Sequence, residues 1–138
     1  MPFLRIAPIC NGKIYVAPRS YQGEEPGKLD IPMEDYIYAC KTDTDKYAKE
    51  VENKYSNHIT GQPEPRFSLK HLVKETNGVK KTIMLYILPL NDEEQIHFTG
   101  GKFVTPEEIE MNSAQYSSFL KEEIDHLNIV TQMWKEFK

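Results

Sequence analysis

The chain has 138 residues and carries 17 basic and 21 acidic side chains, which gives a formal charge of −4. A chain of this length buries enough apolar surface to fold without disulfides or a structural metal. Two cysteines exclude a disulfide scaffold and a multi-cysteine zinc site, and they are typical of a reducing compartment. The mild acidity argues against binding to duplex nucleic acid, for which a basic face is typical.

The sequence indicates neither a targeting segment nor a membrane span. The N-terminus lacks a basic leader followed by a long apolar stretch. The longest strongly apolar run, Ile83–Leu90, is far shorter than the roughly 20 residues that cross a bilayer. We therefore expect one domain over residues 1–138, in the cytoplasm and without a membrane partner.

The first predicted element is a β-hairpin at the N-terminus. Its apolar segments, Phe3–Ile9 and Lys13–Ala17, are separated by Asn11-Gly12, a pair that tolerates the positive φ angles of a tight turn. Residues 21–41 contain Gly and Pro and show no period, so they are predicted to form a loop.

A helix is predicted over residues 42–55, where Thr42, Asp43 and Thr44 are all suitable N-caps. Apolar or aromatic residues recur on one face of this helix, at Tyr47, Ala48, Val51 and Tyr55. A second loop is predicted over residues 56–66.

A second hairpin follows, with Asn77-Gly78 as its turn. The segment before the turn, Phe67–Lys74, alternates apolar and polar residues, whereas Thr82–Leu90 is continuously apolar. We expect the continuous segment inside the sheet, with helices packed on both of its faces.

Two helices are predicted near the C-terminus. Thr105 is a suitable N-cap for a short helix, and Pro106 suits its first position. An apolar stripe then predicts a long helix over residues 113–137, or two helices joined near Asn128.

Three local segments resemble the Nudix hydrolase family. Arg5–Ser20 is similar to the family's opening hairpin, Gly27–Pro32 to its G-x-W-x-L-P segment, and Phe103–Ile109 to its W-x-S-P-E-E-L segment. The resemblance implies an α/β fold, an α/β/α sandwich with a mixed sheet. It also implies hydrolysis of nucleoside triphosphates or nucleoside diphosphate conjugates with the help of magnesium.

The segment that resembles the family's catalytic motif is degenerate. The Nudix box reads G-x5-E-x7-R-E-U-x-E-E-x-G-U, where U is aliphatic, and here Lys49 takes the place of the arginine. Glu50 matches the first glutamate of the helix, but Asn53 and Lys54 stand at the next two, and Ser56 at the glycine.

The helix also lacks a metal-binding pattern when it is considered without the family. Between residues 41 and 56 no two acids are three or four residues apart, so no carboxylate pair shares a helix face. Glu50 is the candidate metal ligand, but a surface ion pair with Lys54 at i+4 is the favoured interpretation. The pattern therefore does not support magnesium, and no residue is assigned as catalytic.

Four residues around the altered loop and helix are candidates for a ligand pocket: Glu34, Tyr36, Asn53 and Lys54. Aromatic rings there, at Tyr36, Tyr38 and Tyr47, could stack on a nucleotide base, but filling space in the fold is the favoured interpretation.

Three functions stay open. The first is binding of a nucleotide-like or phosphorylated small ligand with weak or no hydrolysis. The second is an active magnesium-dependent pyrophosphohydrolase whose ligands include acids outside the usual box, among them Glu34, Glu50, Glu64, Glu93 and Glu94. The third is a non-catalytic protein-interaction module. We rank the functions in the order given.

Three side chains near the C-terminus, Met133, Trp134 and Phe137, are compatible with packing on the sheet or with a homodimer seam, and packing is favoured.

Overall fold

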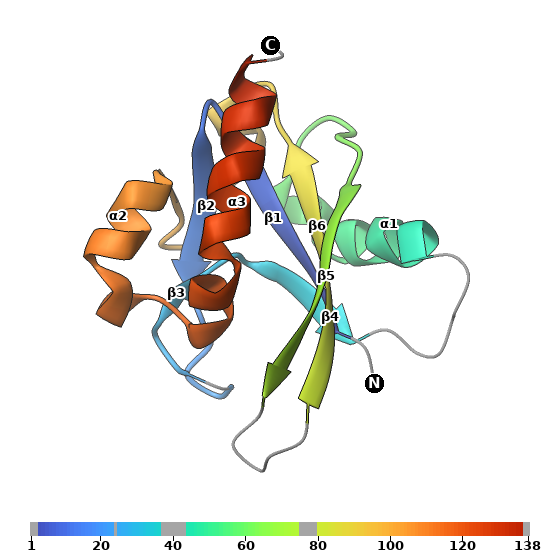
Figure 1. Cartoon of the computed structure of the whole chain (residues 1–138). Coiled ribbons are helices and arrows are strands. Elements are labelled where there is room, and N and C mark those ends of the chain that lie inside the picture. The colour runs from blue at the N-terminus through green and yellow to red at the C-terminus, as the bar shows by residue number, and fades with distance from the viewer. Residues whose placement is uncertain (1–2, 24, 37–43, 75–79, 137–138) are drawn as a thin grey trace.

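The computed structural model describes residues 3–23, 25–36, 44–74 and 80–136. In these ranges the strands form one mixed sheet with the order β3-β2-β1-β6-β5, in which β4 also pairs with β1 and β7 with β2 (Figure 1). The strands are β1 (Phe3–Cys10), β2 (Lys13–Pro18), β3 (Leu29–Asp30), β4 (Met33–Tyr36), β5 (Arg66–Lys74), β6 (Lys80–Pro89) and β7 (Lys102–Val104). β1 is parallel to β6 and antiparallel to β2 and β4.

Helices cover both faces of this sheet. The α-helices are α1 (Thr44–Lys54), α2 (Pro106–Met111) and α3 (Ser118–Glu136), and short 3-10 helices lie at η1 (Ser56–His58), η2 (Glu93–Gln95) and η3 (Ser113–Gln115). Helix α3 crosses the front of the sheet in Figure 1, and α1 packs against the opposite face. The predicted α/β/α sandwich with a mixed sheet is confirmed. None of the helices in the described ranges is long and apolar enough to cross a membrane.

Strand β1 separates two apolar cores because its side chains alternate between the two faces. Ala7 and Ile9 join the core under α2 and α3, whereas Leu4 and Ile6 join the core under α1. Every residue of β1 is buried, and this includes the charged residue Arg5.

Both predicted hairpins have their strands in place. In the first, Cys10 pairs with Lys13 across the turn, and Asn11 and Gly12 take φ angles of 52° and 78°. In the second, β6 lies between β1 and β5, as its continuous apolar sequence predicts. The turn at Asn77-Gly78 lies outside the described residues.

Two element predictions need correction. Residues 21–41 were predicted to be a loop, but they include β3 and β4, and β4 places Glu34 opposite Arg5 on β1. These strands have two and four residues, too few to show a sequence period. The last helix is single through Asn128 and begins at Ser118. It starts there because the Ser117 hydroxyl accepts a hydrogen bond from the Leu120 N–H.

Candidate ligand-binding site

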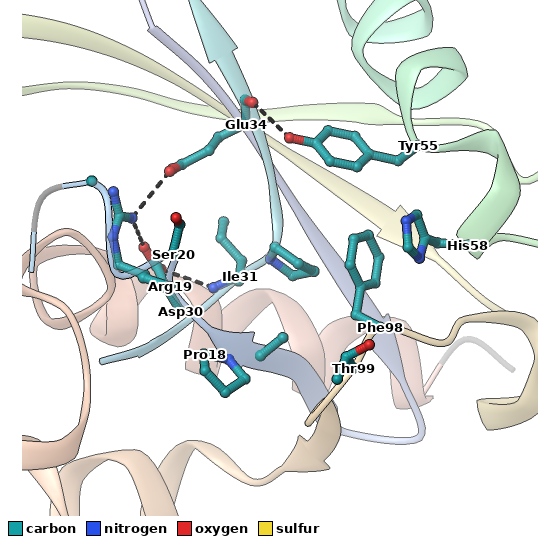
Figure 2. A pocket seen from close by; sticks show the side chains of 13 residues that line it. Pro18, Arg19, Ser20, Asp30, Ile31, Glu34, Tyr55, His58, Phe98 and Thr99 are labelled. Carbon is teal, nitrogen blue, oxygen red and sulfur yellow. Dashed lines mark hydrogen bonds and ion pairs between the residues drawn. The ribbon is translucent and has the colours of Figure 1, made fainter. Parts of the chain in front are cut away.

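A cavity of about 470 Å³ opens where the ends of β2 and η1 face the β3–β4 segment. Figure 2 shows charged side chains on one side of it and aromatic rings on the other. Arg19, Asp30 and Glu34 form the charged side, and Tyr55, His58 and Phe98 form the aromatic side. We call this cavity the main pocket.

The aromatic side is held in place by stacking and by hydrogen bonds. The His58 ring stacks on the Phe98 ring with centroids 4.0 Å apart and planes 8° apart. His58 Nδ1 lies 2.9 Å from the carbonyl oxygen of His97, which can only accept, so Nδ1 carries the hydrogen. The Tyr55 hydroxyl donates to the carbonyl oxygen of Glu34 over 3.1 Å. These contacts fix three rings against one cavity wall.

The charged side rests on a buried arginine. Each of the five N–H groups of Arg5 has a carboxylate acceptor. Its Nη2 lies 2.7 Å from Asp30 and 2.8 Å from Glu123 of α3, and Nη1 contacts Glu34. Arg5 and Glu123 are fully buried, and Asp30 is 1% exposed. A buried arginine in an otherwise apolar strand is stable only with such a complete set of partners.

Arg19 joins the same network from the pocket side. Its Nη1 contacts Asp30 and lies 3.0 Å from Glu34. The guanidinium groups of Arg5 and Arg19 both lie against the Phe119 ring, at 5.3 and 5.4 Å from its centroid. Two arginines and three carboxylates give this network a formal charge of 2 − 3 = −1. We call it the Arg5 network.

Burial and ion pairing compete in the pKa values of this network. Burial disfavours the Arg5 cation, but Asp30, Glu123 and Glu34 outweigh that effect and hold the pKa of Arg5 well above its ordinary value. Burial would raise the pKa of Asp30, but the pairs with Arg5 and Arg19 hold it below its ordinary value. For Glu34, burial dominates and raises the pKa, with Arg5 acting in the opposite direction.

Magnesium needs several oxygen ligands that are not already committed to other cations. Both acids that line the main pocket are paired with arginines. Among the described residues, no group of three or more His, Cys, Asp or Glu side chains is arranged to hold a metal ion. The acids lining the pocket therefore do not fit a magnesium site.

The structure does not bring the predicted pocket residues into one site. Glu34 lines the main pocket, but Asn53 lines a different cavity. Tyr36 is exposed and packs its ring on Phe3, with centroids 4.8 Å apart. Lys54 lies beside Tyr55, with its Nζ 5.5 Å from the Tyr55 ring centroid.

The predicted Glu50–Lys54 ion pair is wrong. Lys54 Nζ instead lies 3.0 Å from Asp35 of β4, a residue 19 positions earlier in the chain. Glu50 is exposed on α1 and forms no ion pair within the described part of the chain. Sequence spacing alone could not show this, because the pairing partner comes from a strand that the sequence did not predict.

The other candidates lie away from the main pocket. Glu64 and Glu94 are exposed, and Glu93 lies 3.7 Å from Lys13. Tyr47 packs against the core under α1 and Trp134 against the core under α3, whereas Met133 is exposed. Tyr38 and Phe137 lie outside the described residues.

The residues that do form the pocket were mostly missed by sequence reasoning. Arg19, Phe98 and the pair Tyr55 and His58 come from three separate segments, and no motif joins them. One signal was present: Arg5 interrupts an apolar strand, and a charge in a strand covered on both faces requires buried partners.

Comparison with known proteins identifies the fold. No protein-family model matches the sequence, and no curated protein matches it. Many solved structures are similar over nearly the whole chain, and three of them are described here. A Nudix hydrolase from Nitrosomonas europaea is 11% identical, with 94% of this chain and 89% of that chain covered and a TM-score of 0.64. The Ap4A hydrolase of C. elegans is 9% identical, with 94% and 96% covered and a TM-score of 0.61.

The third is the Nudix domain of NrtR from Shewanella oneidensis, solved in complex with ADP-ribose. It is 11% identical, with 100% of this chain and 88% of that chain covered and a TM-score of 0.60. This chain therefore has the Nudix hydrolase fold.

Proposed function

We propose that this protein binds a nucleotide-like, phosphorylated ligand in the main pocket, with weak or no metal-dependent hydrolysis. The observation that carries the proposal is the pairing of Asp30 and Glu34 with Arg5 and Arg19. Hydrolysis assisted by magnesium would need uncommitted carboxylates to hold the metal and to orient water. The main pocket offers rings and closed ion pairs instead.

The aromatic side of the main pocket is suited to contact the ring of such a ligand. The pocket volume of about 470 Å³ lies in the usual range for small-molecule sites. Stacking of a base on an aromatic side chain contributes about 1–3 kcal/mol, and it needs little specificity beyond a flat ring. Tyr55, His58 and Phe98 supply the aromatic wall for this contact.

Lys54 does not line the main pocket but lies beside Tyr55 of its aromatic side, so the phosphate groups of the ligand would extend out of the pocket to reach it. The Arg5 network has a formal charge of −1, so it does not attract an anion to the charged side of the pocket. Lys54 is half-exposed beside Tyr55, and its hydrogen bond to Asp35 raises its pKa, which keeps the ammonium charged. An exposed ion pair of this kind contributes little, so a phosphate can replace Asp35 at Lys54. In the resemblance to the Nudix box, Lys54 stands where a metal-binding glutamate is expected, so an ammonium would take over the role of the ion.

ADP-ribose is the first ligand to test, because the Nudix domain of NrtR was solved with it. Calorimetric titration and thermal shift would be measured with and without magnesium, since a ligand that binds the native state raises its apparent stability. We expect binding that does not need magnesium. Lys54→Gln should weaken it about tenfold, whereas Lys121→Gln, on an exposed site of α3, should leave it unchanged.

Hydrolysis would be followed in the same samples by chromatography of the products. Rapid magnesium-dependent cleavage that Glu50→Gln abolishes would overturn the proposal and favour an active pyrophosphohydrolase. If neither ADP-ribose nor nucleoside di- and triphosphates bind, the proposed nucleotide-binding role of the main pocket is wrong.

A further inference from the structure

The segment between β2 and β3, residues 19–28, forms part of the main pocket and contains one strained residue. Arg19, Ser20 and Gly23 of this segment line the pocket, whereas Glu25 does not. The φ angle of Glu25 is 48°, which lies in the left-handed region that residues other than glycine rarely adopt. Such a conformation persists only where the surrounding contacts impose it.

The contacts of the Glu25 side chain come from the N-terminus of α3. The Ser118 N–H lies 3.0 and 3.2 Å from the two carboxylate oxygens of Glu25, and the Ser118 hydroxyl donates to Oε2 over 2.9 Å. The first N–H groups of a helix have no partner within the helix, and the positive end of the helix dipole favours a carboxylate. Glu25 therefore satisfies a free donor of α3 although it lies 93 positions earlier in the chain.

Two further contacts join the same part of the chain to the residues before α3. Lys28 Nζ donates to the carbonyl oxygen of Ala114. The Ser117 N–H donates to the carbonyl oxygen of Leu29 over 2.9 Å. Together with the Glu25 carboxylate, these contacts dock residues 25–29 on residues 114–118.

Backbone hydrogen bonds connect this docked part to the pocket lining. The Lys28 N–H donates to the carbonyl oxygen of Glu25 over 3.2 Å, and the Arg19 N–H donates to that of Lys28 over 2.8 Å. The Gly27 N–H donates to the carbonyl oxygen of Arg19 over 3.1 Å. The Arg19 guanidinium then lies 5.4 Å from the ring centroid of Phe119, which is also on α3. The position of Arg19 in the pocket therefore depends on how the segment docks on α3.

We propose that Glu25 is a positioning residue of the main pocket. Its carboxylate binds the N-terminus of α3 and so fixes the segment that brings Arg19, Ser20 and Gly23 to the pocket. Its effect on ligand binding rests on the proposed function, because Glu25 lies outside the lining and acts through the segment. Its effect on the segment itself is measurable without a ligand.

The test is hydrogen exchange of the backbone amides, measured by NMR on the whole chain without ligand. Glu25→Ala removes the carboxylate, so the amides of Arg19 and Gly27 should exchange about tenfold faster, since local opening controls their exchange. The amide of Phe98, on the aromatic side of the pocket, should change less than about twofold, because a local effect does not reach it. This comparison separates a local loss of docking from a general loss of stability.

Three further variants assign the effect to the carboxylate. Glu25→Gln keeps an oxygen that can accept the Ser118 N–H and should restore most of the protection. Glu25→Gly removes the side chain but adopts the positive φ angle without strain, so it should lose protection as Glu25→Ala does. Glu122→Ala, which removes an exposed acid of α3, is the control and should leave exchange at Arg19 and Gly27 unchanged.

Titration of the same variants with ADP-ribose measures the consequence for binding. Glu25→Ala and Glu25→Gly should raise the dissociation constant about fivefold, because a pocket wall that is no longer held in place must be ordered on binding. Glu25→Gln should remain within about twofold of wild type.

Several outcomes would overturn the role of Glu25. They are unchanged exchange at Arg19 and Gly27 in Glu25→Ala, equal acceleration at Phe98, wild-type protection in Glu25→Gly, and wild-type affinity for ADP-ribose in Glu25→Ala. If the wild-type protein binds no nucleotide, the proposed function is wrong, whereas exchange in the ligand-free protein still decides whether Glu25 positions the pocket.

Discussion

Arg5 Nη2 lies 2.7 Å from Asp30 Oδ1, and neither side chain is more than 1% exposed. Taking both charges out of water is costly, and their attraction offsets this cost only when the remaining hydrogen-bonding groups are also satisfied. Here that condition is met, because Glu123 and Glu34 accept the other N–H groups of Arg5. The pair fixes β3 and β4 against β1 and so positions the charged side of the main pocket.

Asp30→Asn should be strongly destabilising. Asparagine keeps the shape but removes the charge that faces Arg5 and Arg19, and breaking a buried pair on one side costs about 3–5 kcal/mol. Urea unfolding followed by circular dichroism would measure the loss. The matched control is Asp35→Asn, which breaks the exposed pair with Lys54 and should cost less than about 1 kcal/mol. Equal effects of the two substitutions would contradict the structural role given to Asp30.

Glu34→Gln should alter the pH dependence of stability. Because the pKa of Glu34 is raised in the native state, the native protein binds more protons than the unfolded chain above the ordinary value of 4.5. The contribution of Glu34 to the free energy of unfolding is therefore greatest in acid and falls as pH rises through that window. Asp30 acts in the opposite direction, since its lowered pKa gives stability that is lost as pH falls.

The difference between wild type and Glu34→Gln isolates the contribution of Glu34. Unfolding free energies would be measured for both proteins across the acid range. The advantage of wild type should shrink as pH rises from about 4.5. A constant or growing advantage would show that ion pairing, and not burial, dominates at Glu34.

Much of the fold was accessible from the sequence because its main elements have local signals. The Asn11-Gly12 turn, the apolar run of β6 and the Thr105 cap each specify their element within a few residues. The short strands β3 and β4 were missed because a strand of two to four residues is defined by its partner, here β2 for β3 and β1 for β4, and not by its own pattern.

The site was less accessible because it is built from long-range contacts. Arg5 meets Glu123 across 118 positions of sequence, and Tyr55 meets Phe98 in the pocket wall only after α1 has packed on the sheet. Helix spacing favoured Glu50 as the partner of Lys54, but the fold brings Asp35 closer. Motif comparison could only set residues 49–56 beside the Nudix box, whereas the structure shows which residues surround the cavity.

Phe98→Leu should weaken ligand binding in the main pocket with little loss of stability. Leucine removes the ring that stacks on His58 and keeps most of the apolar volume. The loss of one stacking surface predicts an increase of about five- to tenfold in the dissociation constant of ADP-ribose, at the low end of stacking energies. Phe67→Leu, a half-exposed ring on β5 outside the pocket, is the control and should leave the constant unchanged. No change in Phe98→Leu would exclude the aromatic wall as the place of the ligand's ring.

Gly101→Ala should disturb the aromatic side of the main pocket through Tyr15, which supports Phe98. A Cβ at Gly101 would lie 1.9 Å from the hydroxyl oxygen of Tyr15. This separation is far too short for two atoms that are not bonded, so the tyrosine or the backbone would have to move. That hydroxyl accepts the N–H of Phe98 over 2.8 Å, and the Tyr15 side chain is buried, so it has no free space to move into. Overpacking of this kind costs about 1–3 kcal/mol. Gly23→Ala is the control, because the nearest atom to its added Cβ is 3.9 Å away. Thermal unfolding of both variants decides the point: if Gly101→Ala is no less stable than Gly23→Ala, Tyr15 is not the fixed support that the hydrogen bonds to Phe98 imply.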